Sequence, residues 1–259
     1  MSTNAERELQ AAAAESFKPI AIRPPDENWL LFFLRCIVDL QLLTTFRFLR
    51  GKLPACKGRV LDVGAGQSPW RGLLRSADYV GIDVESAGEF GMARQQDIVY
   101  YDGVTIPFAE ASFDHVLCSE VLEHVPAAEP FLAELHRVLR PGGSLVLTIP
   151  WSARTHHLPH DYRRLTRNGL TLLVEAAGFS LLGIEERGND VTVVANKLIV
   201  MTMRLLRPRS PAGVIWAWPL AALLMPVTAS FLVAAHVALR FGLGAREDPL
   251  GYGLLAIKR

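Results

Sequence analysis

Short apolar runs alternate with amphipathic stretches through most of the chain. Runs of this length are typical of buried strands, whereas apolar positions spaced three and four residues apart predict helices. We predict strands at 59–63, 79–84, 113–118, 144–149, 179–184 and 251–258. We predict helices from about Trp70, near 130–139, and over 166–177, with Thr166 as N-cap and Gly178 at the C-terminal end. This alternation indicates βαβ units and a parallel sheet, the pattern of the α/β class.

A strongly apolar segment precedes the first strand. Residues 28–50 are apolar at most positions, with Arg35, Asp39 and Arg47 interspersed. We predict a single helix with more hydrophobic surface than one packing face requires. Two interpretations stay open: the helix packs across the domain, which the scattered charges favour, or it lies on a membrane surface.

A long apolar insertion, 197–246, separates the last two predicted strands. Its stretch 213–239 contains no Asp, Glu, Lys or Arg and exceeds the roughly 20 apolar residues that span a bilayer. The final strand must nevertheless return to the sheet, and arginines flank both ends, so we expect both ends on one side of a membrane. These arginines are Arg204, Arg207, Arg209, Arg240 and Arg246.

Two prolines shape the expected form of this insertion. Pro219 and Pro226 are predicted to divide the apolar stretch into shorter helices. A hairpin or re-entrant element that dips into one leaflet, with Trp216 and Trp218 near the interface, fits this pattern. The alternative is a soluble helical pair that covers the sheet or forms a dimer contact. We favour the membrane, because a large apolar patch otherwise needs a dedicated partner.

Composition narrows the class of protein further. Half of the 259 residues are apolar, enough to bury a core, and 27 Lys and Arg oppose 26 Asp and Glu. The resulting formal charge of +1 offers no field for a polyanion, so we expect no nucleic-acid partner. The 3 unpatterned cysteines and the absence of a visible secretory signal fit a cytoplasmic protein. We divide the chain into a leader with an apolar helix, 1–50, and one domain, 51–259.

A glycine turn follows the first predicted strand. In Asp62-Val63-Gly64-Ala65-Gly66 the missing side chains let the backbone approach a bound nucleotide. The next residues are Gln67-Ser68-Pro69, so the third glycine of dinucleotide-binding turns is absent, which argues against NAD. Further on, Asp83 ends the second strand, where a carboxylate can accept both ribose hydroxyls.

Two later segments carry a family resemblance. The run from Phe113 to Val125, FDHVLCSEVLEHV, and the run from His136 to Leu147, HRVLRPGGSLVL, resemble class I S-adenosylmethionine (SAM)-dependent methyltransferases. The resemblance covers about 58–184 and the last strand. It implies a doubly wound, seven-stranded, mostly parallel sheet whose final strand is antiparallel, with SAM as cofactor.

The resemblance also implies roles for individual residues. The glycine turn faces the methionine part of SAM, Asp83 holds the ribose, and Asp97 with Ile98 recognises adenine. Two open alternatives are that Asp97 is an ordinary surface acid and that Cys118 only packs the core. The implied cofactor-binding residues are Asp62, Gly64, Ala65, Gly66, Asp83, Val84, Asp97, Ile98, Cys118 and Ser119.

Candidate catalytic residues follow the strand at 144–149. His156, His157 and Asp161 lie in a segment whose His, Pro, Asp and Arg spacing is similar to an acceptor-side segment of the family, and histidine offers a base of near-neutral pKa. The competing interpretation is a structural loop in which Asp161 pairs with Arg163 or Arg164.

The segment after the strand at 113–118 also offers side chains that could bind a metal, but we predict no metal site. Glu120, Glu123 and His124 resemble the metal-binding run of ubiquinone-biosynthesis O-methyltransferases and small-RNA 3′-end methyltransferases. The same letters occur in metal-free relatives, where they border the cofactor or brace a helix.

These observations favour a methyltransferase at the cytoplasmic membrane face. Direct displacement at a methyl group needs alignment and exclusion of water, and a base only for some acceptors. We expect the acceptor to be a small or amphipathic molecule, lipid-linked molecules included, that is methylated at an oxygen atom. The alternatives are a membrane-tethered SAM-binding module without turnover and, disfavoured by the turn, a dinucleotide-dependent oxidoreductase.

Overall fold

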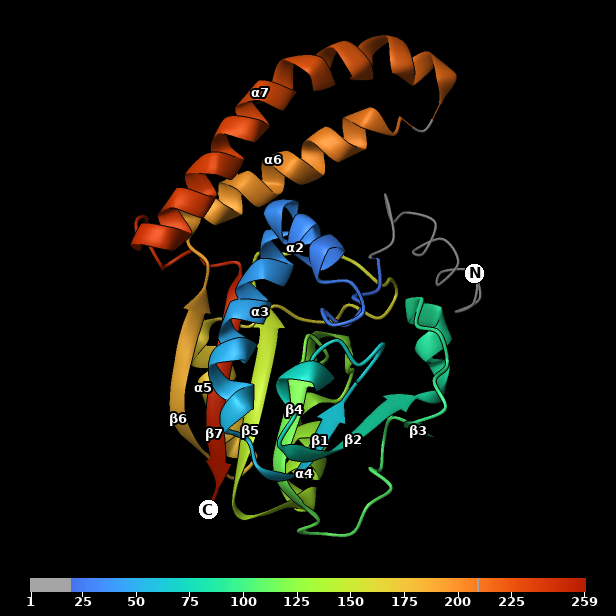
Figure 1. Ribbon diagram of the computed structural model, residues 1–259, viewed down its shortest axis with the longest axis vertical. Coiled ribbons are helices and arrows are strands. Elements are labelled where there is room, and N and C mark those ends of the chain that lie inside the picture. Colours follow the sequence, from blue (N-terminus) through green and yellow to red (C-terminus); the bar gives the residue numbers. More distant parts are fainter. Residues whose placement is uncertain (1–19, 209) are drawn as a thin grey trace, which may run out of the picture.

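The computed structural model describes residues 20–208 and 210–259; the predictions for 1–19 and for Arg209 lie outside the described residues. Its centre is a seven-stranded sheet of order β3-β2-β1-β4-β5-β7-β6 (Figure 1). β7 is antiparallel to both of its neighbours, and the other pairs are parallel. The strands are β1 (Gly58–Val63), β2 (Ala77–Val84), β3 (Ile98–Tyr101), β4 (Phe113–Ser119), β5 (Leu139–Pro150), β6 (Phe179–Arg187) and β7 (Gly251–Lys258). The predicted sheet is confirmed.

Consecutive strand residues fill two separate cores, one on each face of the sheet. Leu61 and Val116 pack with helices α4 (Ala128–Val138) and α5 (Arg167–Ala176), whereas Val60 and Leu117 pack toward the N-terminal helices. This follows from the two-residue period of a strand, which points neighbouring side chains to opposite faces. The helix predicted over 166–177 is confirmed by α5. Thr166 is its N-cap, as predicted, and its side chain accepts a hydrogen bond from the amide of Gly169.

The prediction of one helix over 28–50 is wrong. The chain forms α2 (Trp29–Val38) and α3 (Leu40–Lys52), which meet at Asp39. The Asp39 carboxylate accepts a hydrogen bond from the amide of Leu42 and caps the start of α3, so α2 ends at this residue. α3 packs against the sheet, where the Phe48 ring leaves no room for a side chain at Gly253, whereas α2 exposes most of its apolar residues.

The helix expected from about Trp70 is also absent. Only the short 3-10 turn η2 (Arg71–Leu73) forms between β1 and β2. The connection first makes a turn in which the amide of Ser68 donates to Ala65, and β2 already begins at Ala77. Too few residues remain for an α-helix.

The C-terminal insertion is a pair of helices, α6 (Asp190–Leu206) and α7 (Pro211–Phe241), which lie side by side above the sheet (Figure 1). The prediction that Pro219 and Pro226 divide the apolar stretch is wrong, because both lie inside the continuous α7. Each proline removes one backbone hydrogen bond and bends a helix, while packing along α6 keeps it intact. A buried contact of 2.8 Å between the hydroxyls of Thr202 and Thr228 joins the two helices.

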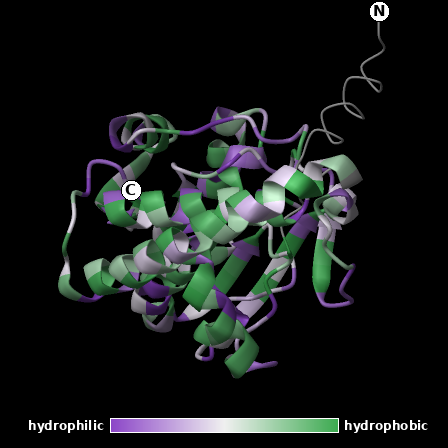
Figure 2. Ribbon diagram, turned by 90° about the horizontal axis from the view of Figure 1, so that it is seen from above, coloured by the Kyte–Doolittle hydropathy of each residue, from purple (hydrophilic) through white to green (hydrophobic). Residues whose placement is uncertain are grey.

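Helix α7 is long and apolar enough to cross a membrane by length and composition, over Ala212–Phe241. Little of its most apolar window is buried inside the protein, at 17 %. Seen from above, hydrophobic residues dominate the helices that face the viewer (Figure 2). The helical pair therefore presents apolar surface that the sheet does not cover.

Candidate active site

A cavity lies at the carboxyl ends of the parallel strands β1, β2, β3 and β4, the edge at which doubly wound folds bind their ligands. The segment after β5 closes one side of it. Its lining residues are Val63, Gly64, Gly66, Asp83, Val84, Ala87, Phe90, Met92, Tyr101, Gly103, Glu120, Val121, His124, Val125, Phe131 and His157.

The glycine turn after β1 forms the floor of this cavity. Gly64 and Gly66 have φ angles of +72° and +54°, which favour glycine. A side chain at Gly64 would lie 2.4 Å from Val121, so the turn can approach η4 (Leu122–His124) only without one. Ser68, which follows the turn, adopts a positive φ of 52° despite its side chain.

The turn is held to β2 through Asp83. One carboxylate oxygen accepts the amide of Gly66 at 2.9 Å and the other accepts the amide of Val84 at 2.8 Å. Burial raises the pKa of Asp83, against the lowering effect of these two amides. A carboxylate has about four acceptor positions, so two remain for hydroxyl groups in the cavity.

Asp62 supports the turn from behind. Its carboxylate accepts the hydroxyl of Tyr79 at 2.8 Å, it does not line the cavity, and burial raises its pKa to about 7. The residue therefore joins β1 to β2 below the site.

Four other predicted cofactor residues are not brought to the cavity. Asp97 precedes β3 and pairs with Arg71, and Ile98 packs in the core. Cys118 is completely buried, and Ser119 hydrogen-bonds the hydroxyl of Thr148 at 2.9 Å. Of the remaining six, Gly64, Gly66, Asp83 and Val84 line the cavity, whereas Asp62 and the buried Ala65 lie behind it.

Four residues around β3 line the cavity and were not predicted from the sequence. Tyr101 and Gly103 line the cavity, and Phe90 and Met92 reach it from the segment before β3. Residues after a parallel strand reach the ligand edge and residues before it do not, but no strand was predicted at 98–101, so the first pair could not be placed.

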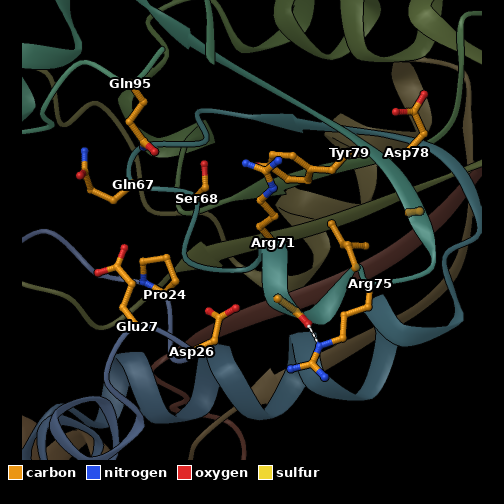
Figure 3. Close-up of a pocket in the computed structure, with 13 residues that line it drawn as sticks. Pro24, Asp26, Glu27, Gln67, Ser68, Arg71, Arg75, Asp78, Tyr79 and Gln95 are labelled. Atoms are coloured by element: carbon orange, nitrogen blue, oxygen red, sulfur yellow. Dashed lines mark hydrogen bonds between the residues drawn. The ribbon is translucent and has the colours of Figure 1, made fainter. Parts of the chain in front are cut away.

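A larger cavity, of about 700 Å³, lies on the outer side of the glycine turn (Figure 3). It separates the segment 24–27 from the stretch 67–79 and has a largely polar lining that includes Arg71. Arg71 lies over the Tyr79 ring, 5.0 Å from its centre, and also pairs with Asp97. Of the two cavities, only the smaller one presents Asp83.

A histidine cluster lies at one side of the smaller cavity. His124 comes from η4, and His156, His157 and His160 come from the loop after β5; the ring centres of the first three lie 4.8 to 5.3 Å apart. His157 lines the cavity and packs against Phe90. Burial, and then the neighbouring histidines, lower the pKa of His157 to about 3, so its imidazole is neutral near pH 7.

Asp161 organises the loop that carries these histidines. It accepts the backbone amide of His156 at 3.0 Å and two hydrogen bonds from Arg164 at 2.6 and 2.8 Å. Burial raises the pKa of Asp161, but hydrogen bonds from His156 and Arg164 outweigh this effect and lower it. The expected pairing with Arg164 is present, whereas Arg163 donates instead to the carbonyls of Leu122, Val125 and Pro126.

Glu120 occupies the cavity wall in a strained conformation, with a φ of 55°. The Arg187 guanidinium donates to it at 2.7 Å and also to the carbonyls of Ile149 and Tyr252. Arg187 is buried, with 1 % of its side chain exposed, and has no sequence signal of its own. The cavity wall is thus tied to the end of β6, just where the helical insertion leaves the sheet.

The family model described as a methyltransferase domain matches residues 61–147, the segment that builds this cavity. Residues 61–147 therefore form a methyltransferase domain of the class I, SAM-dependent type. The resemblance in β4 and β5 is therefore confirmed, and the cofactor of this family is SAM.

Two curated methyltransferases illustrate the similarity. The "Fatty-acid O-methyltransferase" of Mycolicibacterium smegmatis is 35 % identical over 158 residues, which cover 56 % of this chain and 57 % of the relative. The "Phthiotriol/phenolphthiotriol dimycocerosates methyltransferase 1" of Mycobacterium ulcerans is 40 % identical over 99 residues, which cover 35 % and 36 %. In both, the similarity extends over little more than half of the relative, or less.

A solved structure shows the same fold. The cyclase SpnF has a TM-score of 0.51 and 19 % identity, covering 83 % of this chain and 80 % of that one. At this identity the likeness concerns the fold alone. Because a cyclase shares this fold, the fold alone does not determine which reaction a protein catalyses.

Proposed function

We propose that this methyltransferase modifies an oxygen atom of an amphipathic or lipid-linked acceptor at the cytoplasmic face of a membrane. One observation carries the proposal: α2 and the pair α6 and α7 lie beyond the carboxyl ends of the parallel strands, the end at which the cofactor cavity is found (Figure 1). The names of the two curated relatives, one acting on fatty acids and one on dimycocerosates, support a lipid acceptor.

The cavity provides the alignment that methyl transfer needs. SAM, when bound, supplies the electrophilic methyl group. Asp83 and the glycine turn are the proposed holders of its ribose and methionine parts, and His157 faces the same cavity from the other side. Asp161 fixes the backbone of His156 and so positions this loop. Apolar residues such as Phe90 and Val121 exclude water from the space between.

We expect the purified protein to transfer a labelled methyl group from SAM to a long-chain fatty acid or a lipid-linked hydroxyl, and to discriminate against short-chain analogues. A carboxylate acceptor is already ionised and a hydroxyl acceptor is not, so His157→Ala should slow only hydroxyl methylation. Because its lowered pKa makes His157 a weak base, we expect roughly a 10-fold effect. Thin-layer separation of labelled products measures both. SAM binding without transfer to any acceptor in a total lipid extract would support the non-catalytic module instead.

The exposed apolar surface supports the membrane part of the proposal. Trp216 and Trp218 of α7 are 81 % and 56 % exposed, and Trp29 of α2 is 66 % exposed. His236 of α7 bonds the carbonyl of Ile37 in α2, so both helices contribute to one surface. The end at which α6 leads into α7 carries Arg204 and Arg207, whose positive charges anionic lipid headgroups attract.

We expect the protein to float with vesicles that contain anionic lipid. Burial of one large apolar side chain contributes roughly 1.5 to 3 kcal/mol, so replacing both Trp216 and Trp218 by serine should weaken partitioning by at least about 10-fold. Leu172→Ser is the matched control, because Leu172 is 68 % exposed on α5. A protein that stays with the aqueous fraction and sediments as a dimer would contradict membrane binding and favour a protein interface.

A further inference from the structure

The wall between the cofactor cavity and the loop after β5 holds a second cluster of chemically active side chains. Glu123 and His124 end η4, and His156 comes from the loop after β5. One ligand atom from each of the three lies within 4.8 Å of the others. The pairing found for Glu120 with Arg187 removes that carboxylate from the set, and His156 joins it from a distant part of the chain.

Glu123 is the unusual member of this cluster. Its side chain is completely buried, and neither carboxylate oxygen has a hydrogen-bond partner among the described residues. The positive charge of Arg164 lowers the pKa of Glu123, but its guanidinium is already paired with Asp161. A buried ionised carboxylate is costly unless it is paired or coordinates a metal. The structure therefore presents a buried carboxyl group that needs either a cation or a proton.

Both imidazoles are oriented as metal ligands are. The Nδ1 atom of His124 lies 2.5 Å from the carbonyl oxygen of His160, and Nδ1 of His156 lies 3.0 Å from that of Arg154. A carbonyl only accepts, so each Nδ1 carries the proton and each Nε2 keeps a lone pair. This second hydrogen bond is what orients metal-binding histidines in proteins. Nε2 of His124 lies 3.7 Å from the Glu123 carboxylate.

We propose that Glu123, His124 and His156 bind one divalent transition-metal ion of the zinc type. Two imidazole nitrogens and one carboxylate oxygen are a ligand set of open zinc sites, in which a further position stays free. His124 also lines the cofactor cavity, so the free position borders the acceptor side. If the chain is the methyltransferase proposed above, this position suits an acceptor oxygen, whose pKa a bound metal lowers. Metal binding itself does not depend on that function.

The test titrates EDTA-treated, detergent-purified full-length protein with Co²⁺, whose visible absorption reports coordination by nitrogen and oxygen. We expect one Co²⁺ per chain, displaced by Zn²⁺, and a higher thermal midpoint with Zn²⁺. Glu123→Gln, which keeps the shape of the side chain, and His156→Ala should each weaken Co²⁺ binding by at least about 100-fold. His160→Gln is the matched control, because only the backbone carbonyl of His160 contacts His124.

The opposite result is equally clear. Absence of Co²⁺ absorption in the wild type, or binding that Glu123→Gln leaves unchanged, would overturn the metal site and identify Glu123 as a buried protonated acid, in line with the raised pKa that burial gives it. SAM affinity is measured on the same samples. Retained SAM binding in Glu123→Gln separates loss of the metal from failure of the cofactor site.

Discussion

Asp83→Ala should lower the affinity for SAM by at least about 100-fold. The two acceptor positions that Asp83 leaves open are the expected partners of two hydroxyl groups, and hydrogen bonds to a charged group contribute about 1.5 to 3 kcal/mol each. The glycine turn also loses its tie to β2, because Gly66 donates to the same carboxylate. Calorimetric titration of the protein with SAM measures the loss.

Two further variants make this result interpretable. Asp83→Asn keeps an acceptor for the turn and should lie between alanine and wild type, with a wild-type thermal midpoint. Asp97→Asn tests the expected adenine contact; since Asp97 pairs with Arg71 outside the cavity, we expect a change of less than about threefold. Unchanged SAM binding in Asp83→Ala would refute this placement of the cofactor.

Arg187→Met should destabilise the whole domain by roughly 3 to 5 kcal/mol, since it removes the buried member of a charged pair together with its hydrogen bonds to three other groups. Arg187 joins four segments to β6: it donates to the side chain of Thr45 in α3, to one carbonyl in β5 and one in β7, and to Glu120 after β4. For a domain of this size the expected fall in thermal midpoint is on the order of 6 to 20 °C. Thermal unfolding followed by circular dichroism measures it.

The matched control is a nearby surface pair that joins α5 to β6. Arg167 pairs with Glu186, but 46 % of the Arg167 side chain is exposed, so Arg167→Met should cost less than about 1 kcal/mol. Arg187→Met with Glu120→Gln should recover part of the stability, because no unpaired carboxylate then remains. Equal midpoints for Arg187→Met and Arg167→Met would show that Arg187 contributes no more than a surface charge.

Local sequence determined six of the seven strands and the cofactor turn of this protein; β3 was not predicted. Each predicted strand is found within a few residues, because a buried parallel strand must be apolar along its whole length. The glycine turn and Asp83 were predictable for a similar reason, since positive φ angles and a strand-end carboxylate are properties of a few adjacent residues. The antiparallel direction of β7 was predicted from the family resemblance, and its pairing with β5 and β6 confirms that prediction.

Only the tertiary structure decided how distant segments meet. Asp39 divides the N-terminal helix, α7 runs through Pro219 and Pro226 against α6, and His156 reaches Glu123 and His124. Whether a proline bends or ends a helix, and whether a charged group is buried or solvated, depends on what packs against it. Such contacts join residues far apart in the chain, and no local pattern of hydrophobic and polar positions records them.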